Sequence, residues 1–493
     1  MHIKNILQYL EETVKKCPDR VAFSDGKESL SFEDAYDKAL SVGSFICDGG
    51  YSREAVVILM EKSPKTVASF LGVIYSGCFY VCIDTDAPMY RIKSIIGKVG
   101  ARVAIYDRPN AQKAVLLPDG VEKILYDDIE NYLHNCEKLS SVRNRQVDVD
   151  PVYVIFTSGS TGEPKGVCTS HRSVIDYTEA LCKNLGFDGS CIFGNQAPLY
   201  LDSPIKEIMP ALKCGASVYL IPKALFSQPA KLCDFLNRHK VNTICWVSSA
   251  LVILSKLGAL ESNPPRFLRK ICFGGEVMPL SQYEKWIRAY PDADFYNLYG
   301  PTEATGMSSF WRADRTLYDG EKIPIGRAFD NTEIFLFNSE IYIRGTCLCL
   351  GYIGGDNSAF VQNPTHNNYP DIVFKTGDYA EINSHGELVF ICRADGMIKH
   401  NGYRVEICEI ENTALQCEDV ILCACVFVGG NIYMFYTGDI NNEDLIGFLS
   451  ERLQKYMLPH KAFRLEQMPK TQSGKINRNE LKKMLEDKTW KSL

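Results

Sequence analysis

Apolar and polar positions follow two alternating periods along the first two thirds of the chain. Short apolar runs such as VVILM (56–60) and TICWV (243–247) have the length and content of buried strands. Longer segments with helical spacing separate them, for example SPKTVASFLGVIYSG (63–77) and AKLCDFLNRHK (230–240). Strands that alternate with helices are typical of mostly parallel sheets covered by helices, so the pattern predicts an α/β fold.

The spacing changes towards the last third of the chain. EIFLF (333–337) and EIYIRG (340–345) are short strands separated by turn residues. They indicate a β-rich subdomain over roughly residues 320–394. Together with the alternating region, this subdomain completes a predicted large N-terminal domain of residues 1–394.

A pattern of its own follows RADG (393–396). CACVFV (423–428) and IYMFYT (432–437) predict two strands, and a helix is predicted from Glu443 to Tyr456. The leucines that share one face of this helix are Leu445, Leu449 and Leu453. Residues 395–493 are therefore predicted to form a small separate α+β domain.

Length and composition restrict the class of protein. A chain of 493 residues exceeds the ~250–300 residues that one hydrophobic core supports, which agrees with two domains. A net charge of −6 gives no reason to propose a nucleic-acid partner. Because no stretch approaches the ~18 apolar residues of a membrane span and no signal-peptide core is present, we expect a cytoplasmic protein without a membrane partner. The 19 cysteines include no C-x-x-C pair and predict buried reduced thiols.

The stretch TSGSTGEPKGV (157–167) follows a short apolar run and has the chemistry of a phosphate-binding loop. Glycines allow close backbone approach, hydroxyls donate to anionic oxygens, successive N–H groups form an anion site, and Lys165 adds a charge. It is not a Walker A loop, because the chain contains no G-K-[ST] triplet. Taken alone, such a stretch is equally compatible with a flexible surface loop.

Further motifs follow the loop in a fixed order. They are GGE (274–276), NLYGPTE (297–303), KTGD (375–378), RADGMIKHNGYRVE (393–406) and PKTQSGKINRNEL (469–481). With the loop, they resemble the ordered motifs of the adenylate-forming (ANL) superfamily, which contains adenylation domains of nonribosomal peptide synthetases, acyl- and aryl-CoA ligases, and luciferase. The resemblance spans nearly the entire chain. It implies that a substrate carboxylate attacks the α-phosphate of ATP, that magnesium pyrophosphate leaves, and that the acyl group then passes to a thiol.

The resemblance also implies roles for individual residues, and such in-line displacement needs positioning and charge neutralisation. The expected contacts to the β- and γ-phosphates come from Ser158, Gly159, Ser160, Thr161, Gly162 and Lys165. The other expected nucleotide-binding residues are Gly274, Gly275, Glu276, Asn297, Tyr299, Asp378, Arg393 and Lys399, with Tyr299 against adenine and Asp378 and Arg393 on the ribose. Thr302 is expected to contact the α-phosphate, and Glu303 to bind Mg²⁺. ATP and Mg²⁺ are the implied cofactors.

Lys475, in the Ser-Gly-Lys turn, matches a family lysine that enters the site and pairs with the substrate carboxylate and the phosphate. In the family the C-terminal domain rotates between an adenylating and a thiolating arrangement. Asp395 matches the hinge position of that rotation, and Gly396 beside it eases the dihedral change. Asn401, where arginine is frequent in the family, is a departure that bears on thiolation.

The acid to be activated is indicated by LYLDSPIKEIMPAL (199–212). Asp202 matches the aspartate that binds the α-ammonium group in amino-acid-activating members; a helix N-cap is the alternative reading. The other pocket positions implied by the resemblance are Ser203, Lys206, Ser249, Ile271, Phe273, Leu298, Gly306 and Met307. Because a cation in such a pocket requires an anion, Lys206 suggests an acidic, aspartate- or glutamate-like amino acid, unless its side chain points to solvent.

Three functions remain open on the sequence alone. The leading one is a free-standing amino-acid adenylation enzyme that loads the phosphopantetheine thiol of a separate carrier protein, since no carrier-protein serine motif is present in the chain. The second is an acyl- or aryl-CoA ligase. The third is a nucleotide-binding scaffold without chemistry, against which the joint presence of Lys165, Glu303, Asp378 and Lys475 argues.

Overall fold

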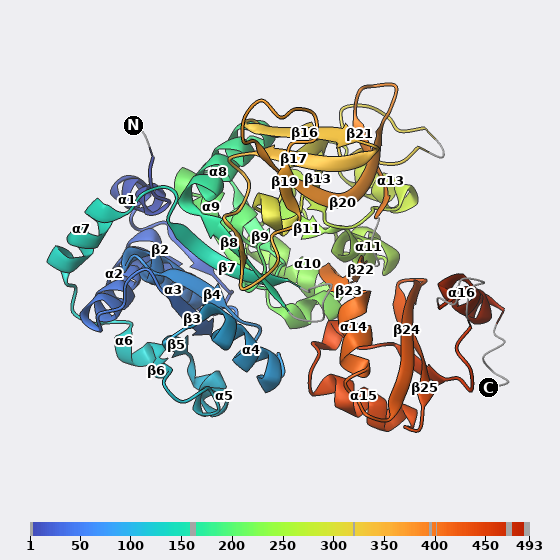
Figure 1. The fold of residues 1–493 in the computed structure, drawn as a ribbon. Coiled ribbons are helices and arrows are strands. Elements are labelled where there is room, and N and C mark those ends of the chain that lie inside the picture. The colour runs from blue at the N-terminus through green and yellow to red at the C-terminus, as the bar shows by residue number, and fades with distance from the viewer. Residues whose placement is uncertain are drawn as a thin grey trace.

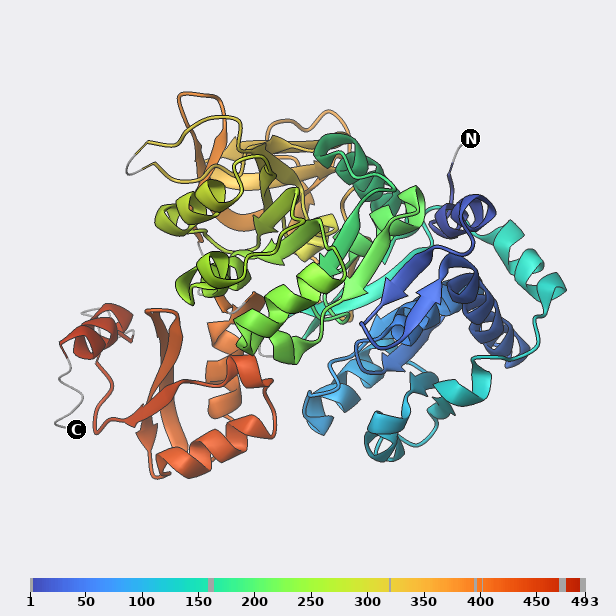
Figure 2. The ribbon, with the colours of Figure 1, turned by 180° about the vertical axis from the view of Figure 1, so that it is seen from behind.

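The computed structural model describes residues 3–157, 164–318, 321–393, 397–400, 402–469 and 476–487. Figure 1 shows a large N-terminal body, a β-rich sheet on one side of it, and a smaller C-terminal lobe. Seen from behind, the C-terminal lobe again lies below the β-rich sheet and beside the core (Figure 2). This arrangement confirms the predicted fold class.

One large sheet of the core has nine strands within the described residues. In spatial order they are β15 (Arg327–Ala328), β14 (Ser309–Arg312), β13 (Asp294–Tyr299), β12 (Lys270–Gly274), β11 (Thr243–Val247), β9 (Ile192–Asn195), β10 (Ser217–Leu220), β1 (Val21–Ser24) and β2 (Ser29–Ser31). The strands from β13 to β1 run parallel to one another, whereas β14 pairs antiparallel with β13 and β2 with β1. The carboxyl ends of the parallel strands therefore meet at one edge of the sheet.

The second large sheet has seven strands in the described part of the chain. In spatial order they are β18 (Gly351–Ile353), β8 (Lys165–Ser170), β7 (Pro151–Thr157), β4 (Phe79–Cys82), β3 (Ala55–Leu59), β5 (Val103–Tyr106) and β6 (Glu122–Leu125). The strands from β7 to β6 run parallel, and β8 turns back against β7.

Helices cover both sheets. They are α1 (Leu7–Lys16), α2 (Phe32–Asp48), α3 (Pro64–Tyr75), α4 (Met89–Val99), α5 (Ala111–Val115), α6 (Tyr126–Ile129), α7 (Cys136–Arg145), α8 (His171–Leu185), α9 (Ile205–Cys214), α10 (Pro229–Arg238), α11 (Ser248–Lys256), α12 (Ala259–Ser262) and α13 (Leu280–Ala289), with short 3₁₀ turns η1 (Arg108–Asn110), η2 (Lys223–Ser227) and η3 (Thr302–Ala304). Local sequence sets their starts: Ser31 and Asp34 form a capping box at α2, and Ser63 caps α3 ahead of Pro64.

The hydrophobic clusters show how these layers stack. One cluster joins residues of both sheets, such as Tyr153 and Cys272, to α2, α3, α8 and α9, which places these helices between the sheets. The opposite face of the nine-stranded sheet, including Ile271 and Phe273, packs with α10, α11 and α13. Because successive side chains of a strand point to opposite faces, each sheet is buried on both sides.

The β-rich sheet lies next to the core and carries two of the predicted nucleotide-binding residues. Its strands are β16 (Thr332–Phe337), β17 (Glu340–Gly345), β20 (Ile372–Ile382) and β19 (Phe360–Gln362), with β21 (Leu388–Arg393) paired to β20. In the β20–β21 register, Asp378 is directly opposite Arg393.

The C-terminal lobe consists of a hairpin, a small sheet and three helices among the described residues. They are β22 (Met397–His400), β23 (Tyr403–Glu406), α14 (Ile407–Ala414), β24 (Val420–Val428), β25 (Asn431–Gly438), α15 (Asn442–Ser450), η4 (Lys455–Met457), β26 (Lys461–Arg464) and α16 (Arg478–Glu486). The helix predicted to reach Tyr456 ends at Ser450. Leu453 is nevertheless buried, because its N–H bonds to the carbonyl of Leu449 in a turn that continues the apolar face.

Two buried polar contacts join the lobe to the core. Arg91 on α4 donates to the carboxylate of Glu409 on α14 at 2.5 Å, and both side chains are almost fully buried. The Gln454 amide donates to Asp84 at 3.1 Å. The predicted domain boundary at Asp395 lies outside the described residues and stays a prediction. Among the described helices, none has the length and apolar composition to cross a bilayer.

Substituting Gly274 tests how closely the strand ends must approach one another. A Cβ at Gly274 would lie 2.1 Å from the carbonyl oxygen of Leu298, so Gly274→Ala must push β12 away from β13. We expect the free energy of unfolding, measured by urea denaturation, to fall by about 1–3 kcal/mol, because the backbone cannot move aside as a flexible side chain does. Gly97→Ala in α4 is the control: its Cβ meets nothing within 4 Å, and about 0.5–1 kcal/mol of stabilisation is expected. If both substitutions changed the free energy of unfolding equally, the close approach of β12 and β13 at Gly274 would not be a constraint on stability.

Candidate active site

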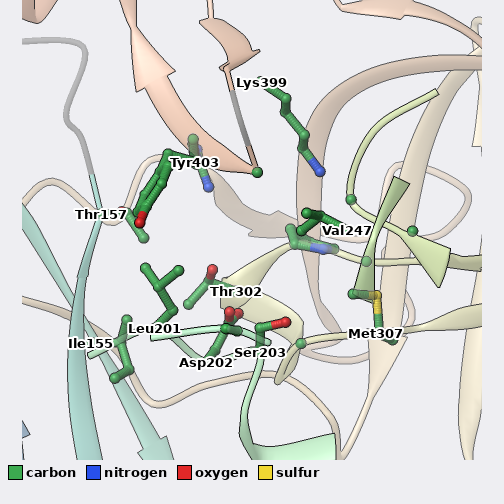
Figure 3. A pocket seen from close by; sticks show the side chains of 18 of the residues that line it. Ile155, Thr157, Leu201, Asp202, Ser203, Val247, Thr302, Met307, Lys399 and Tyr403 are labelled. Carbon is green, nitrogen blue, oxygen red and sulfur yellow. The ribbon is translucent and has the colours of Figure 1, made fainter. Parts of the chain in front are cut away.

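A cavity lies where the carboxyl ends of strands from both large sheets meet the β22–β23 hairpin. Thr157 ends β7, Val247 ends β11 and Gly274 ends β12, and all three line the cavity. Figure 3 shows Lys399 and Tyr403 of the hairpin on one side and Asp202, Ser203 and Thr302 on the other. Open α/β sheets bind ligands at this end of their strands.

Asp202 lies on the cavity floor close to Thr302 (Figure 3). Burial raises the pKa of the Asp202 carboxyl, while the hydroxyl of Thr302 and the charge of Lys206 partly lower it. The alternative role as a helix cap is wrong, since α9 begins at Ile205 with Pro204 as its N-cap and no side-chain cap. A cation next to Asp202 would further stabilise its charged form.

Lys206 also lines the cavity, although it lies on α9. Its side chain is only 3% exposed, so the reading in which it points to solvent is wrong. The ammonium donates to the hydroxyl of Ser203. A buried ammonium with a hydroxyl partner favours an anion nearby.

A second layer of buried charge lies behind this wall. Glu207 follows Lys206 on α9 and accepts a hydrogen bond from the Asn195 amide. Lys62 donates to the carbonyls of Asn195, Gln196 and Ile221 at 3.0–3.2 Å. Burial raises the pKa of Glu207 to about 7 and lowers the pKa of Lys62 to about 7. Each of these two charges moderates the shift of the other.

Asp378 is held at another wall of the cavity. Arg393, its cross-strand neighbour, donates to one carboxylate oxygen at 2.5 Å, and the hydroxyl of Tyr299 donates to the other at 2.6 Å. Burial and this bond raise the pKa of the Tyr299 hydroxyl well above its ordinary value. Asp378 and Arg393 line the cavity; the ring of Tyr299 packs among Ala304 and Ile325.

Glu303 is fully buried and joins the core to the hairpin. Arg404 donates to its two oxygens at 2.8 and 2.9 Å, and the hydroxyl of Tyr352 donates at 2.6 Å. Burial alone would raise the pKa of Glu303, but the charge of Arg404 and the bond from Tyr352 lower it below its ordinary value. Lys165 lies 5.3 Å from the centre of the Tyr352 ring.

Further contacts fix the hairpin over the cavity. Glu276 accepts from the N–H of Gly402 at 2.7 Å and from the N–H of Ser249 at 3.0 Å. Tyr403 stacks on Tyr456 with ring centres 3.8 Å apart. Burial lowers the pKa of the Lys399 ammonium, which points into the cavity, and the charge of Asp378 raises it in part (Figure 3). Lys399, Gly402, Tyr403 and Arg404 of the hairpin therefore line the cavity.

The structure brings together only part of the predicted set. The predicted residues that line the cavity are Asp202, Ser203, Lys206, Gly274, Gly275, Thr302, Gly306, Met307, Asp378, Arg393 and Lys399. Placing Ile271 and Phe273 in the pocket was wrong: they point to the opposite face of β12 from Cys272 and towards α10 and α13. Leu298 belongs to the core, and neither Ser249 nor Asn297, whose amide bonds to the Pro324 carbonyl, lines the cavity.

Several predicted residues lie outside the described part of the chain. They are Ser158, Gly159, Ser160, Thr161, Gly162, Asp395 and Lys475. Conversely, Tyr352 and Tyr200 were not predicted, although Tyr352 holds Glu303 and the Tyr200 hydroxyl lies 3.2 Å from that of Tyr403. Tyr352 lies in none of the motifs, and Tyr200, although it lies within the stretch 199–212, carried no predicted role, so only the fold revealed their contacts.

Comparison with known proteins agrees with this two-lobed cleft. The AMP-binding enzyme family model matches residues 10–353. The D-alanine–D-alanyl carrier protein ligase of Staphylococcus haemolyticus is 28% identical over 97% of this chain and 98% of its own length. The Vibrio cholerae adenylation domain AlmE, solved with glycyl-adenosine-5′-phosphate, has a TM-score of 0.84 at 19% identity, covering 99% of this chain and 98% of its own. The o-succinylbenzoate CoA synthetase of Bacillus subtilis has a TM-score of 0.83 at 20% identity, covering 98% of both chains.

The fold and the cleft define a two-lobed adenylate-forming enzyme. The chain belongs to the AMP-binding enzyme family, because the family model covers more than half of it. The two solved structures are similar in fold, and since one is an amino-acid-type adenylation domain and the other a CoA synthetase, the fold does not separate the two chemistries.

Removing Arg404 tests the contact between hairpin and core. Arg404→Met leaves the Glu303 carboxylate buried without its cation, so we expect a loss of about 3–5 kcal/mol in the free energy of unfolding by urea at pH 7. The pKa of Glu303 is lowered in the folded state. The stabilisation is therefore present above the unfolded pKa, near 4.5, and is lost as the pH falls through the folded pKa.

The matched control is Arg102→Met, because Arg102 pairs with Glu54 at 2.5 Å but its side chain is 60% exposed. An exposed pair contributes about 0–1 kcal/mol. The free energies of unfolding of Arg404→Met and of the wild type should become more similar as the pH falls. If their difference stays the same on acidification, the Arg404–Glu303 pair is not its source.

Proposed function

We propose that this enzyme activates an amino acid as its adenylate, using ATP, and transfers the aminoacyl group to the phosphopantetheine thiol of a separate carrier protein. The observation that carries this proposal is Asp202, a carboxylate whose pKa is raised by burial on the floor of the cavity that Asp378 and Arg393 also line. A substrate ammonium adds a cation beside Asp202, in addition to the charge of Lys206, and further stabilises the charged carboxylate. The likeness to D-alanine–D-alanyl carrier protein ligase supports the same reaction.

The nucleotide end of the site is assigned to Asp378 and its partners. With Arg393 on one oxygen and Tyr299 on the other, the Asp378 carboxylate keeps a fixed orientation, as a ribose-binding group must. Thr302 offers a hydroxyl to the α-phosphate between this end and Asp202. Lys165 lies beside the predicted phosphate loop and adds a cation. These groups bind and orient the reacting atoms and perform no covalent step.

Mg²⁺ fits Glu303 in part. Magnesium takes one or two carboxylates and completes its shell with water and phosphate oxygens. In this arrangement of the lobes, however, Arg404 and Tyr352 occupy both Glu303 oxygens. We infer that Glu303 would hold the ion, which supplies charge neutralisation to the leaving pyrophosphate, when the hairpin is displaced. Lys475 is the proposed lysine that pairs with the substrate carboxylate in that other arrangement.

Lys206 defines the proposed substrate more closely. Its buried ammonium lines the same wall as Asp202, while the nearby Glu207 carboxylate accepts a hydrogen bond from Asn195 behind the wall. When the α-ammonium of an amino acid binds Asp202, the Asp202 carboxylate is no longer available as a partner for Lys206. A side-chain carboxylate then restores neutrality, so the favoured substrate is acidic, aspartate- or glutamate-like.

Asp202→Ala tests the activation of an amino acid. In ATP–pyrophosphate exchange screened over amino acids, we expect kcat/KM for the best substrate to fall by about 10²-fold or more, because truncating one partner of a buried charge pair costs 2–5 kcal/mol. Asp292→Ala, an exposed aspartate on the chain entering β13, is the control and should keep the wild-type rate. Exchange with aryl or fatty acids but with no amino acid would favour the CoA-ligase alternative and refute the proposal.

Lys206→Met tests the acidic side chain separately. We expect kcat/KM to fall by about 10²-fold for aspartate or glutamate and to rise for their amides, since the variant keeps the bulk but loses the cation. Lys213→Met, which removes a cation from the same helix outside this cavity, should leave the preference unchanged. An unaltered preference in Lys206→Met would exclude an acidic substrate but leave amino-acid activation intact.

A further inference from the structure

Two thiols meet at the far ends of the helices that border the substrate cavity. Cys182 lies in the last turn of α8, and Cys214 is the last residue of α9. Their sulfur atoms are 3.7 Å apart. The two sulfur atoms of a disulfide are about 2.0 Å apart, so a relative shift of about 1.7 Å would bring these sulfurs to bonding distance.

This pair is open to a solvent-borne reagent. Cys182 and Cys214 line a surface hollow together with Lys213 and Lys183, and Cys214 is partly exposed. The adjoining cation Lys213 favours an anionic sulfur. The position is separate from the proposed active site, since this hollow and the substrate cavity share no lining residue.

The two sulfurs also differ in acidity. The contact with the Cys182 sulfur lowers the pKa of the Cys214 thiol despite burial, and the charge of Lys213 lowers it further. The same contact and burial raise the pKa of Cys182. By contrast, burial raises the pKa of other cysteines, for example Cys168 and Cys233 to about 11.

We propose that Cys182 and Cys214 are a reversible oxidation site, which a hydroperoxide converts to an intramolecular disulfide between the ends of α8 and α9. The Cys214 thiolate attacks one peroxide oxygen, the O–O bond breaks, and Cys214 becomes a sulfenic acid. The Cys182 sulfur then attacks the Cys214 sulfur, the S–O bond breaks and water leaves. With hydrogen peroxide, the two thiols lose two electrons and two protons, and the peroxide becomes two waters.

The cross-link would act on elements of the proposed substrate site. α9 begins at Ile205, three residues after Asp202, and carries Lys206 in its first turn, about 12 Å from Cys214 along the helix. α8 carries Tyr177, which packs against Gly306 in the cavity wall: a Cβ added at Gly306 would lie 3.3 Å from the Tyr177 hydroxyl. The disulfide therefore fixes the spacing of two helices that both contact the substrate end.

The test is peptide mapping of the full chain after graded hydrogen peroxide. Trypsin places Cys182 in peptide 173–183 and Cys214 in peptide 214–223. We expect these two peptides to appear linked, two hydrogens lighter than their sum, and to separate again with dithiothreitol. Their free thiols should disappear about tenfold faster than those of peptides 241–256 and 271–285.

Those last peptides carry the matched control pair, Cys245 and Cys272, which are register partners on β11 and β12 but 2% and 0% exposed. Cys214→Ser should abolish the link, and Cys245→Ser should leave it intact. Cys17, whose sulfur lies 3.0 Å from a Cβ at Gly215, is the nearby competitor. A link through Cys17, or equal loss of all thiols, would overturn the proposal. The mass measurement needs no substrate, so its failure is distinct from a failure of the proposed function.

Discussion

The buried Glu303 carboxylate is the constraint on which the arrangement of the two lobes depends. A fully buried charge is tolerated only with compensation, and here the compensation comes from Arg404 of the C-terminal lobe and Tyr352 of the core. Because one partner lies on the hairpin, the lobe cannot leave without exposing Glu303 to another cation or to water.

The rest of the interface supports this contact without duplicating it. Arg91 with Glu409 and Glu276 with the N–H of Gly402 hold the hairpin and α14 against the core. These are polar contacts between surfaces that would otherwise be solvated, so their net energies are small compared with a hydrophobic core. The interface between the lobe and the core is therefore held mainly by a few directed polar contacts.

The buried charged groups of the core form two layers at different distances from the cavity. Lys62 and Glu207 lie behind the wall, where strand-end carbonyls and the Asn195 amide bind them. Asp202 and Lys206 lie at the wall itself. The first pair is structural, since it ties the ends of β9 and β10 to α9. The second pair faces the space that a substrate fills, and this separation is why the ammonium and the side-chain contacts of the proposed substrate can be assigned to two different residues.

The sequence by itself determined the α/β layers, the β-rich sheet and the C-terminal lobe, because hydrophobic spacing reports which faces are buried. Its motifs also drew attention to Asp378, Arg393 and Thr302, which line the same cavity. It did not determine that α15 ends at Ser450, that Ile271 and Phe273 face away from the cavity, or that Lys206 is buried. Only the tertiary structure decided these points and the contacts of Tyr352 with Glu303 and of Cys182 with Cys214. Local periodicity is fixed by neighbours along the chain, whereas strand register, burial of single polar groups and contacts between distant segments depend on how the layers pack.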